Sequence, residues 1–311
     1  MSVTFSGGIT FTGGGFSFTP PPPPPSGNKA IFGYGFGSGF TAITNLVSNA
    51  GVVANDTSGV GSGRNSLAAA GYGTDKAIFG YGYTGSNTSI TNLVSNTGVV
   101  ASNTTGVGTA REGLAAACYG TDKAIFGYGS GPTAVTNKVS NTGVVATDTT
   151  GVGSARYGLA AASYGTDTAI FGYGYNNSIG GYLSMTNKVS NTGVVATDTT
   201  GVGSTRRSLA AAGYGTDKAI FGYGDSSTGN QSMTNLVSNT GVVATDTTGV
   251  GTSRTRLAAA VYGTDKAIFG YGYNGTSSVS ITNLVSNTGV VATDTTGVGT
   301  ERDGLAAAAY G

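Results

Sequence analysis

Residues 257–272 read LAAAVYGTDKAIFGYG, and this stretch decides the fold because close copies of it recur along the chain. The segment AIFGYG begins at Ala30, Ala77, Ala124, Ala169, Ala219 and Ala267, so successive copies start 45 to 50 residues apart. Its companion LAAAxYG begins at Leu67, Leu114, Leu159, Leu209, Leu257 and Leu305. The repetition indicates that residues 29–311 are six copies of one supersecondary unit.

Each unit is expected to form four short strands. The first is LAAAxY, and a Gly-Thr-Asp turn connects it to the second, KAIFGYG. A polar loop leads to the third strand, TNLVSN, and a Thr-Gly turn leads to the fourth, VVATDTT. Valine, isoleucine, phenylalanine, tyrosine and threonine favour strands, and glycine interrupts every apolar period that would suit a helix. The sequence therefore predicts an all-β fold.

The phase of the repeat carries topological information. The first unit begins at its second strand, at Lys29, and the chain ends with a sixth copy of the first strand, residues 305–310. Pairing of residues 305–310 with residues 30–34 would complete the first unit. We therefore expect a six-bladed β-propeller with four-stranded blades, closed by the C-terminal strand pairing with the first repeat. An open solenoid, the alternative, would need polar capping repeats, and the sequence contains none.

Residues 1–28 lie outside the repeats. Apolar residues alternate from Val3 to Phe18, which predicts an extended β tail suited to anchoring. Six consecutive prolines, Pro20 to Pro25, then favour a polyproline II rod of about 19 Å. We expect an N-terminal β tail over 1–19, a polyproline linker over 20–28 and the propeller over 29–311. A disordered leader is the alternative for the first two segments.

The units resemble kelch repeats. An arginine stands three residues before each leucine of LAAAxYG, as Arg111 does before Leu114. The second strand ends in Gly-Tyr-Gly, as at residues 127–129, where kelch units have Gly-Gly. Kelch units also lead to a tryptophan, and this chain has none. The resemblance covers residues 29–311 and implies a kelch-like propeller.

The composition excludes several classes of function. The 311 residues include no His and one Cys, and 15 basic and 14 acidic residues leave a net charge of +1. Without histidine the usual general base and the commonest zinc or copper ligand are missing. A net charge near zero argues against nucleic-acid binding, and no stretch has the roughly 18 apolar residues of a membrane span. We expect a protein that is not an enzyme and that uses no metal, cofactor, nucleic acid or membrane insertion.

The six copies differ in two places. All length differences fall in the loop between the second and third strands, and the pair of residues after each repeat arginine also varies. Because strands alternate in direction, both places should lie on one face of the molecule. Loops on a rigid scaffold often carry recognition, so we expect the variable face to bind a ligand. Neutral drift of unconstrained loops is the alternative.

Candidate ligand-binding residues on that face combine aromatic plates with hydrogen-bonding groups, a mixture that suits a glycan or another polar surface. They are Phe36, Phe40, Tyr83, Asn87, Tyr157, Tyr175, Asn177, Tyr182, Arg207, Asp225, Gln231, Arg256 and Tyr273.

Three other kinds of residue have a structural interpretation. The repeat arginines are expected to bind backbone carbonyls between units, although a ring of arginines could also hold an anion. The aspartates of the fourth strand, Asp198 among them, look like solvated edge residues. Cys118 replaces a small residue and has no histidine to activate it, so we expect it to fill space.

The anchor, rod and head together indicate display on a larger particle. The leader Gly-Gly-Ile-Thr-Phe resembles leaders of marine phage (cyanophage-type) virion structural proteins, and no segment resembles a secretory signal. We expect a homo-oligomeric virion structural protein, made in the host cytoplasm and placed on a phage tail or surface appendage. Residues 1–28 would bind other virion proteins, and the propeller would attach to a host glycan, a host protein or a subunit. The alternative is a bacterial cell-surface adhesin or a kelch-type protein-binding scaffold.

Overall fold

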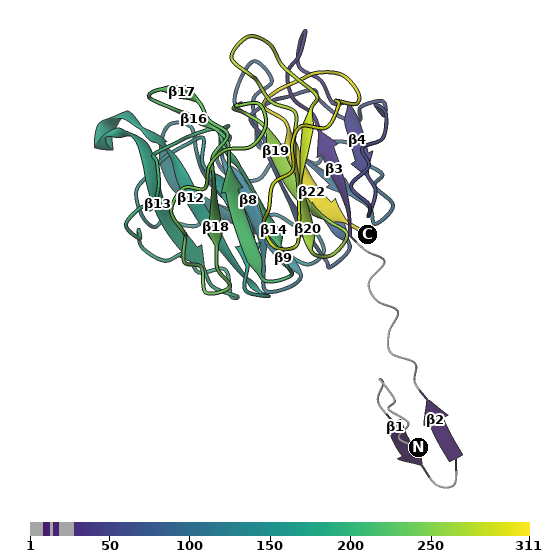
Figure 1. Cartoon of the computed structure of the whole chain (residues 1–311). Helices are drawn as coiled ribbons and strands as arrows, with labels where there is room; N and C mark the ends of the chain where they lie inside the picture. Colours follow the sequence, from purple (N-terminus) through teal and green to yellow (C-terminus); the bar gives the residue numbers. More distant parts are fainter. Residues whose placement is uncertain (1–8, 13–14, 19–27) are drawn as a thin grey trace.

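The computed structural model describes residues 9–12, 15–18 and 28–311. Within these residues the chain forms small antiparallel sheets and no α-helix, and one 3-10 turn, η1 (Asn177–Ile179), interrupts the strands (Figure 1). The prediction of an all-β fold is confirmed. No helix in the described part of the chain has the length and hydropathy to cross a membrane.

Six sheets of three strands repeat one pattern, in which the AIFG strand lies between an Ala-rich strand and a Thr-Asn-containing strand. In chain order of the central strand they are β22 (Ala306–Tyr310), β3 (Lys29–Gly33) and β4 (Thr44–Val47); β5 (Ala68–Tyr72), β6 (Lys76–Gly80) and β7 (Thr91–Val94); β8 (Ala115–Tyr119), β9 (Lys123–Gly129) and β10 (Thr133–Val139); β11 (Ala160–Tyr164), β12 (Thr168–Asn176) and β13 (Gly181–Val189); β14 (Ala210–Tyr214), β15 (Lys218–Gly222) and β18 (Thr234–Val237); and β19 (Ala258–Tyr262), β20 (Lys266–Gly270) and β21 (Thr282–Val285).

Two hairpins stand apart from this pattern. One pairs β16 (Asp225–Ser226) with β17 (Gly229–Asn230) in a variable loop. The other pairs β1 (Ile9–Thr12) with β2 (Gly15–Phe18) inside the predicted N-terminal tail. The predicted polyproline rod, residues 20–25, lies outside the described residues.

The C-terminal strand completes the first sheet, as the phase of the repeat predicts. β22 pairs with β3 from Ala306 opposite Gly33 to Tyr310 opposite Lys29, and the two strands lie side by side near the C-terminus in Figure 1. Residues almost a chain length apart are therefore neighbours in one sheet.

The fourth strand expected in each unit is not continuous. In the first unit, Val53 and Thr57 form single bridges to Val47 and Thr44, and all six units repeat these two bridges. Between them the side-chain amide of Asn45 donates to the Ala54 carbonyl at 3.0 Å. The Ala54 N–H donates to the Leu46 carbonyl at 2.8 Å, so backbone and side-chain bonds together hold a loosely bridged outer segment beside three continuous strands.

The sheets pack face to face through a phenylalanine that lies on a glycine. A Cβ atom on Gly127 would lie 2.7 Å from Cζ of Phe171 in the next sheet, closer than real Cβ contacts come. The glycine of AIFGYG is therefore needed for the approach of its neighbour. The six pairs are Gly33 with Phe79, Gly80 with Phe126, Gly127 with Phe171, Gly172 with Phe221, Gly222 with Phe269, and Gly270 with Phe32.

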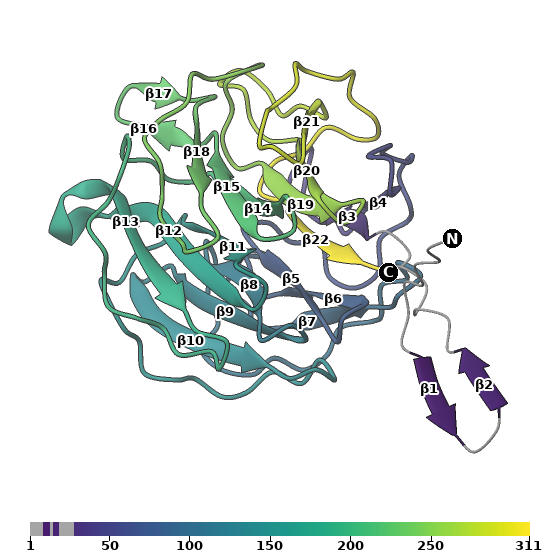
Figure 2. The same ribbon diagram turned by 60° about the horizontal axis from the view of Figure 1, so that its bottom comes forward.

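The Ala-rich strands lie nearest the common centre in Figure 2, and each contacts two others. Just before each of these strands, one residue donates its backbone N–H to the carbonyl of its counterpart in the preceding unit, and the first unit donates to the last. We call these residues the hydrogen-bond ring. The bonds run from Ser66 to Gly304 (2.7 Å), Gly113 to Ser66 (2.8 Å), Gly158 to Gly113 (2.7 Å), Ser208 to Gly158 (2.6 Å), Arg256 to Ser208 (2.8 Å) and Gly304 to Arg256 (2.8 Å).

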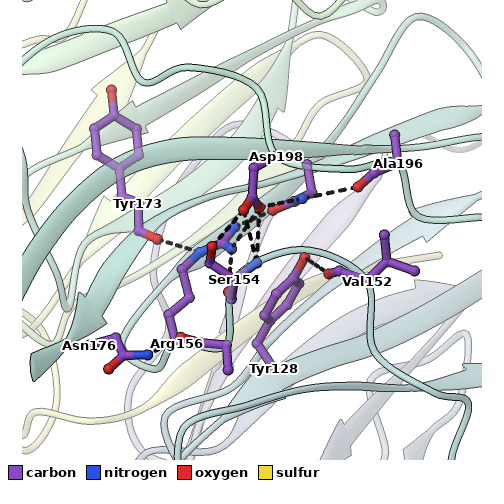
Figure 3. Close-up of polar contacts among 10 residues, drawn as sticks. Tyr128, Val152, Ser154, Arg156, Tyr173, Asn176, Ala196 and Asp198 are labelled. Atoms are coloured by element: carbon purple, nitrogen blue, oxygen red, sulfur yellow. Dashed lines mark hydrogen bonds and ion pairs between the residues drawn. The ribbon is translucent and has the colours of Figure 1, made fainter. Parts of the chain in front are cut away.

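The repeat arginines are fully buried between sheets. Arg156 donates from Nε to the Tyr173 carbonyl at 2.8 Å and from Nη2 to Asn187 Oδ1 at 2.6 Å. Its guanidinium carbon lies 4.3 Å from the ring centroid of Tyr128, in the preceding sheet (Figure 3). The predicted bonds to backbone carbonyls are thus present, and an asparagine and a tyrosine ring complete the arginine's surroundings.

The aspartates of the outer segment are not simply solvated edge residues, as their alternating pattern predicted. Asp198 Oδ2 accepts from the backbone N–H of Ser154 at 2.9 Å and from its hydroxyl at 2.6 Å, and Oδ1 accepts from Asn187 Nδ2 at 2.9 Å (Figure 3). Oδ1 also lies 3.8 Å from Nη1 of Arg156. Each such aspartate therefore holds the chain that arrives from the preceding unit.

Replacing the inter-sheet glycine tests the packing. We expect Gly127→Ala to lower the free energy of unfolding by about 1–3 kcal/mol, because the new methyl group would overpack the Phe171 ring. Gly39→Ala is the matched control, since a Cβ there has no heavy atom within 4 Å. Urea unfolding followed by circular dichroism measures both variants, and an unchanged Gly127→Ala would contradict the role given to the contact.

Asp198→Asn tests the aspartate bridge. Burial opposes ionisation of Asp198, but hydrogen bonds from Ser154 and Asn187 and the charge of Arg156 outweigh it and hold its pKa below the ordinary value. A lowered folded-state pKa stabilises the fold above the unfolded pKa, and that stabilisation is lost as pH falls through the folded-state pKa. At pH 7 we expect a loss below about 1 kcal/mol, because the pair is partly exposed.

The difference between Asp198→Asn and the wild type should shrink as pH falls below the ordinary aspartate pKa and through the lowered folded-state pKa of Asp198. The second unit provides the precedent for this variant. Asn103 there accepts from Asn92 Nδ2 at 3.0 Å and donates to Ser62 Oγ at 2.8 Å, so an asparagine fits this place. A difference in the free energy of unfolding that stays constant from pH 7 to pH 2 would refute the electrostatic explanation.

Candidate functional site

A central cavity of about 1320 Å³ lies at the end of the molecule where the two variable positions meet. All six units contribute to its lining, which contains five members of the hydrogen-bond ring. A smaller cavity of about 90 Å³ shares the ring residues and is otherwise lined by the leucine that follows each of them. The central cavity is thus continued by a narrow recess between the six leucines.

Backbone pairing brings the two variable positions together. Tyr83, which opens the loop of its unit, donates its N–H to the Asn65 carbonyl at 2.9 Å, and Asn65 donates in return at 3.1 Å. The same bridge joins Tyr157 with Tyr175 and Arg207 with Asp225. The prediction that the loops and the residues after the repeat arginine share one face is confirmed.

Most of the predicted site residues line the central cavity. They are Phe36, Phe40, Tyr83, Tyr157, Tyr182, Arg207, Asp225, Arg256 and Tyr273.

The other four predicted residues support the loops and do not line the cavity. Tyr175 packs behind the wall, with its ring centroid 5.0 Å from that of Tyr182, and its hydroxyl donates to Asn177 Oδ1 at 2.5 Å. Asn87 donates to Ser130 Oγ at 3.2 Å. Gln231 donates to the Gly229 carbonyl of its own loop at 2.9 Å.

Sequence reasoning did not select several polar residues of the lining, namely Asn65, Glu112, Ser130, Thr255, Ser278 and Asp303. Four of them, Asn65, Glu112, Thr255 and Asp303, occupy the position directly after a repeat arginine. That position also holds Tyr157 and Arg207, which the sequence analysis did select. Selecting the position after the arginine in all six units would have included these four residues.

Aromatic side chains form two clusters on the cavity wall. In the first, Phe40 lies between Phe36 and Tyr83, with centroid distances of 5.3 and 5.8 Å. Phe36 and Phe40 remain 38% and 39% exposed, which is high for phenylalanine. In the second, Tyr157 and Tyr182 flank the supporting Tyr175. The cavity therefore offers apolar surfaces from two groups of units.

Arg207 and Asp225 neutralise each other within the wall. Arg207 Nε lies 3.0 Å from Asp225 Oδ2, and its guanidinium carbon lies 4.6 Å from the Tyr175 ring centroid. Asp225 also accepts from the Tyr182 hydroxyl at 3.1 Å and from Thr255 Oγ1 at 2.8 Å. These groups fix the tyrosine wall and leave Arg207 little freedom to bind a ligand charge.

Arg256 and Glu112 are less engaged. Arg256 belongs to the hydrogen-bond ring and has a φ of 54°, a left-handed conformation, where three other units have glycine. Its side chain is 58% exposed, and its nearest carboxylate oxygen, Asp303 Oδ1, is 3.7 Å from Nη1. Burial raises the pKa of Glu112, an effect that the charge of Arg256 partly offsets.

The described residues contain no group of three or more histidine, cysteine, aspartate or glutamate side chains that could hold a metal ion. Cys118 lies away from the cavity lining, its Sγ 3.2 Å from the Gly71 carbonyl, and burial raises the pKa of its thiol. The arrangement of the cavity is suited to stacking and hydrogen bonding with a ligand.

No protein-family model matches the chain, and no curated protein matches it. The resemblances to kelch repeats and to phage virion proteins therefore stay predictions.

Proposed function

We propose that the six sheets are the blades of a closed, kelch-like β-propeller, each blade completed by its bridged outer segment. Three series of contacts support this proposal because each returns to its starting unit. They are the hydrogen-bond ring, the Phe–Gly pairs, which end with Phe32 on Gly270, and the Asp56 bridge to Thr300. Pairing of β22 with β3 joins the two ends of the chain in one blade.

The propeller, in this proposal, is a non-enzymatic recognition head that binds a glycan in the central cavity. The observation that carries the proposal is the wall composition: exposed aromatic rings from two groups of blades with amide, hydroxyl and charged groups between them. Aromatic faces stack on the apolar faces of sugars, and polar side chains bind their hydroxyl groups. Both kinds of group converge here on one concave surface.

The pairing of the carboxylates supports binding over hydrolysis. Glycosidases act with two carboxyl groups, one on each side of the scissile bond. Asp225 is held by Arg207, Tyr182 and Thr255, and Asp303 accepts from Ser278 Oγ at 2.9 Å. Glu112 is left as a single carboxylate with no side-chain hydrogen bond within the described chain.

We propose further that the head is carried on a virion, on a phage tail or other surface appendage, with residues 1–28 as its attachment to neighbouring virion proteins. The arrangement of β tail, proline run and repeat domain supports this setting, and several copies on one particle would bind a host surface by avidity. A cell-surface adhesin or a kelch-type protein-binding scaffold is the second candidate, because the same cavity would serve either protein.

Phe40→Ala tests glycan binding. We expect about tenfold weaker binding to the glycan found by array screening, because loss of one stacked ring costs on the order of 1.4 kcal/mol. Val144→Ala is the control, since Val144 is equally apolar, 66% exposed and outside the cavity lining. Titration calorimetry measures both affinities, and equal binding by the two variants would move the site away from the cavity.

The virion setting has its own test. We expect mass spectrometry of purified particles to find the protein in a fixed ratio to the other structural proteins, since an attached appendage has a defined copy number. A secretome prepared from the same culture before lysis should lack it. Recovery from the cell surface or secretome without particles would support the adhesin instead.

A further inference from the structure

Two opposite charges lie at the base of the central cavity, and they are not held in a close ion pair like that of Arg207 and Asp225. Glu112 precedes Gly113 in the hydrogen-bond ring, and Arg256 is itself a ring member. Going from unit to unit, Gly113 and Arg256 are three steps apart in a ring of six, so they lie on opposite sides of it. The positive charge of Arg256 nevertheless lowers the pKa of the Glu112 carboxyl, against the larger effect of burial.

The two groups do not contact each other. Within the described residues, the side chain of Arg256 has Asp303 Oδ1, at 3.7 Å, as its salt-bridge partner and makes no hydrogen bond. Glu112 uses its backbone N–H, which donates to Ser130 Oγ at 3.1 Å, and its carboxylate has no hydrogen-bond donor there. A half-buried carboxylate and an exposed guanidinium thus face one gap with their hydrogen-bonding capacity unused.

We propose that Glu112 and Arg256 together bind the hydroxyl groups of an uncharged sugar residue, and so select neutral glycans over anionic ones. The inference rests on the proposed glycan-binding function. The carboxylate accepts from hydroxyl groups on one side of the sugar, and the guanidinium donates to hydroxyl oxygens on the other. The aromatic clusters hold the following sugars at the rim.

The remaining charges support this selectivity. Arg207 and Asp225 neutralise each other, which leaves Glu112 and Asp303 with Arg256 as the charges that face the ligand. Glu112, Asp303 and Arg256 together carry a net charge of −1, so an anionic sugar would be repelled by the two carboxylates. A neutral sugar can satisfy both sides of the gap.

The test compares ligand charge and pair variants. Wild-type protein is titrated by calorimetry at pH 7 with neutral hexasaccharides of glucose, mannose and galactose and with anionic hexagalacturonate. We expect a neutral oligosaccharide to bind at least tenfold more tightly than hexagalacturonate. Glu112→Gln and Arg256→Ser should each weaken that binding about tenfold, as loss of a charge-assisted hydrogen bond does.

The chain offers matched controls. Serine occupies the ring position of Arg256 in two other units, Ser66 and Ser208, with φ of 51° and 52°, so Arg256→Ser should fold. Glu301→Gln removes the chain's other glutamate, which is exposed and outside the cavity lining, and should leave affinity unchanged. We expect the double variant Glu112→Gln/Arg256→Ser to lose less binding free energy than the sum of the two single losses, because both residues bind the same sugar.

The outcomes separate the two proposals. If no glycan of any charge binds, the proposed function is wrong and the pair has no sugar to select. If hexagalacturonate binds most tightly, or if both single variants bind the neutral ligand within twofold of wild type, glycan binding stands and the role of the pair is overturned. Circular dichroism melts confirm that each variant remains folded before its affinity is compared.

Discussion

The contact on which the rest of the structure depends is a phenylalanine ring lying on a bare glycine of the neighbouring sheet. A single three-stranded sheet places apolar side chains such as Ile31 and Phe32 on both of its faces, so it needs neighbours to bury them. The ring of Phe171 reaches within 2.7 Å of the place where a side chain on Gly127 would begin, and the hydrophobic clusters accordingly combine residues of adjacent sheets. Stability therefore resides between units, and each unit needs a neighbour on both sides.

That need explains why charge and polarity are concentrated at the same interfaces. An arginine with no exposed surface would be costly unless every donor found a partner. Arg156 meets a carbonyl, an asparagine, a tyrosine face and a distant aspartate, and its counterparts in the other units are buried in the same way. Arg206 is the exception, because its Nε and Nη1 lack hydrogen bonds within the described chain. Leu183, which lies in β13 just after the turn of the long variable loop, bridges to Arg206, so loop variation reaches this interface.

Much of this architecture could be predicted from the sequence because the same unit occurs six times along the chain. Strand order, the pairing of residues 306–310 with residues 29–33 and the shared face of the variable positions all follow from repeat phase and loop length. The interrupted outer segment could not be predicted, since only the folded position of Asn45 reveals that its side chain, and not a backbone N–H, donates to the Ala54 carbonyl. Likewise Asp198 alternates like an exposed residue but contacts a serine 44 positions away. The local pattern of apolar and polar residues does not reveal which residues contact a neighbouring unit.

The difference between contacts that recur in every unit and residues that vary also explains the candidate site. Because Phe–Gly, arginine and aspartate contacts recur in every unit, the residues between them are free to differ without loss of the scaffold. Ring positions can hold glycine, serine or arginine, and only the arginine at 256 projects a charge from a left-handed backbone. Its opposite unit carries the half-buried Glu112. Six similar units thereby place a positive group on one side of the cavity and a negative group on the other. Such a difference between the two sides would let a repeat protein hold an asymmetric ligand in a single orientation.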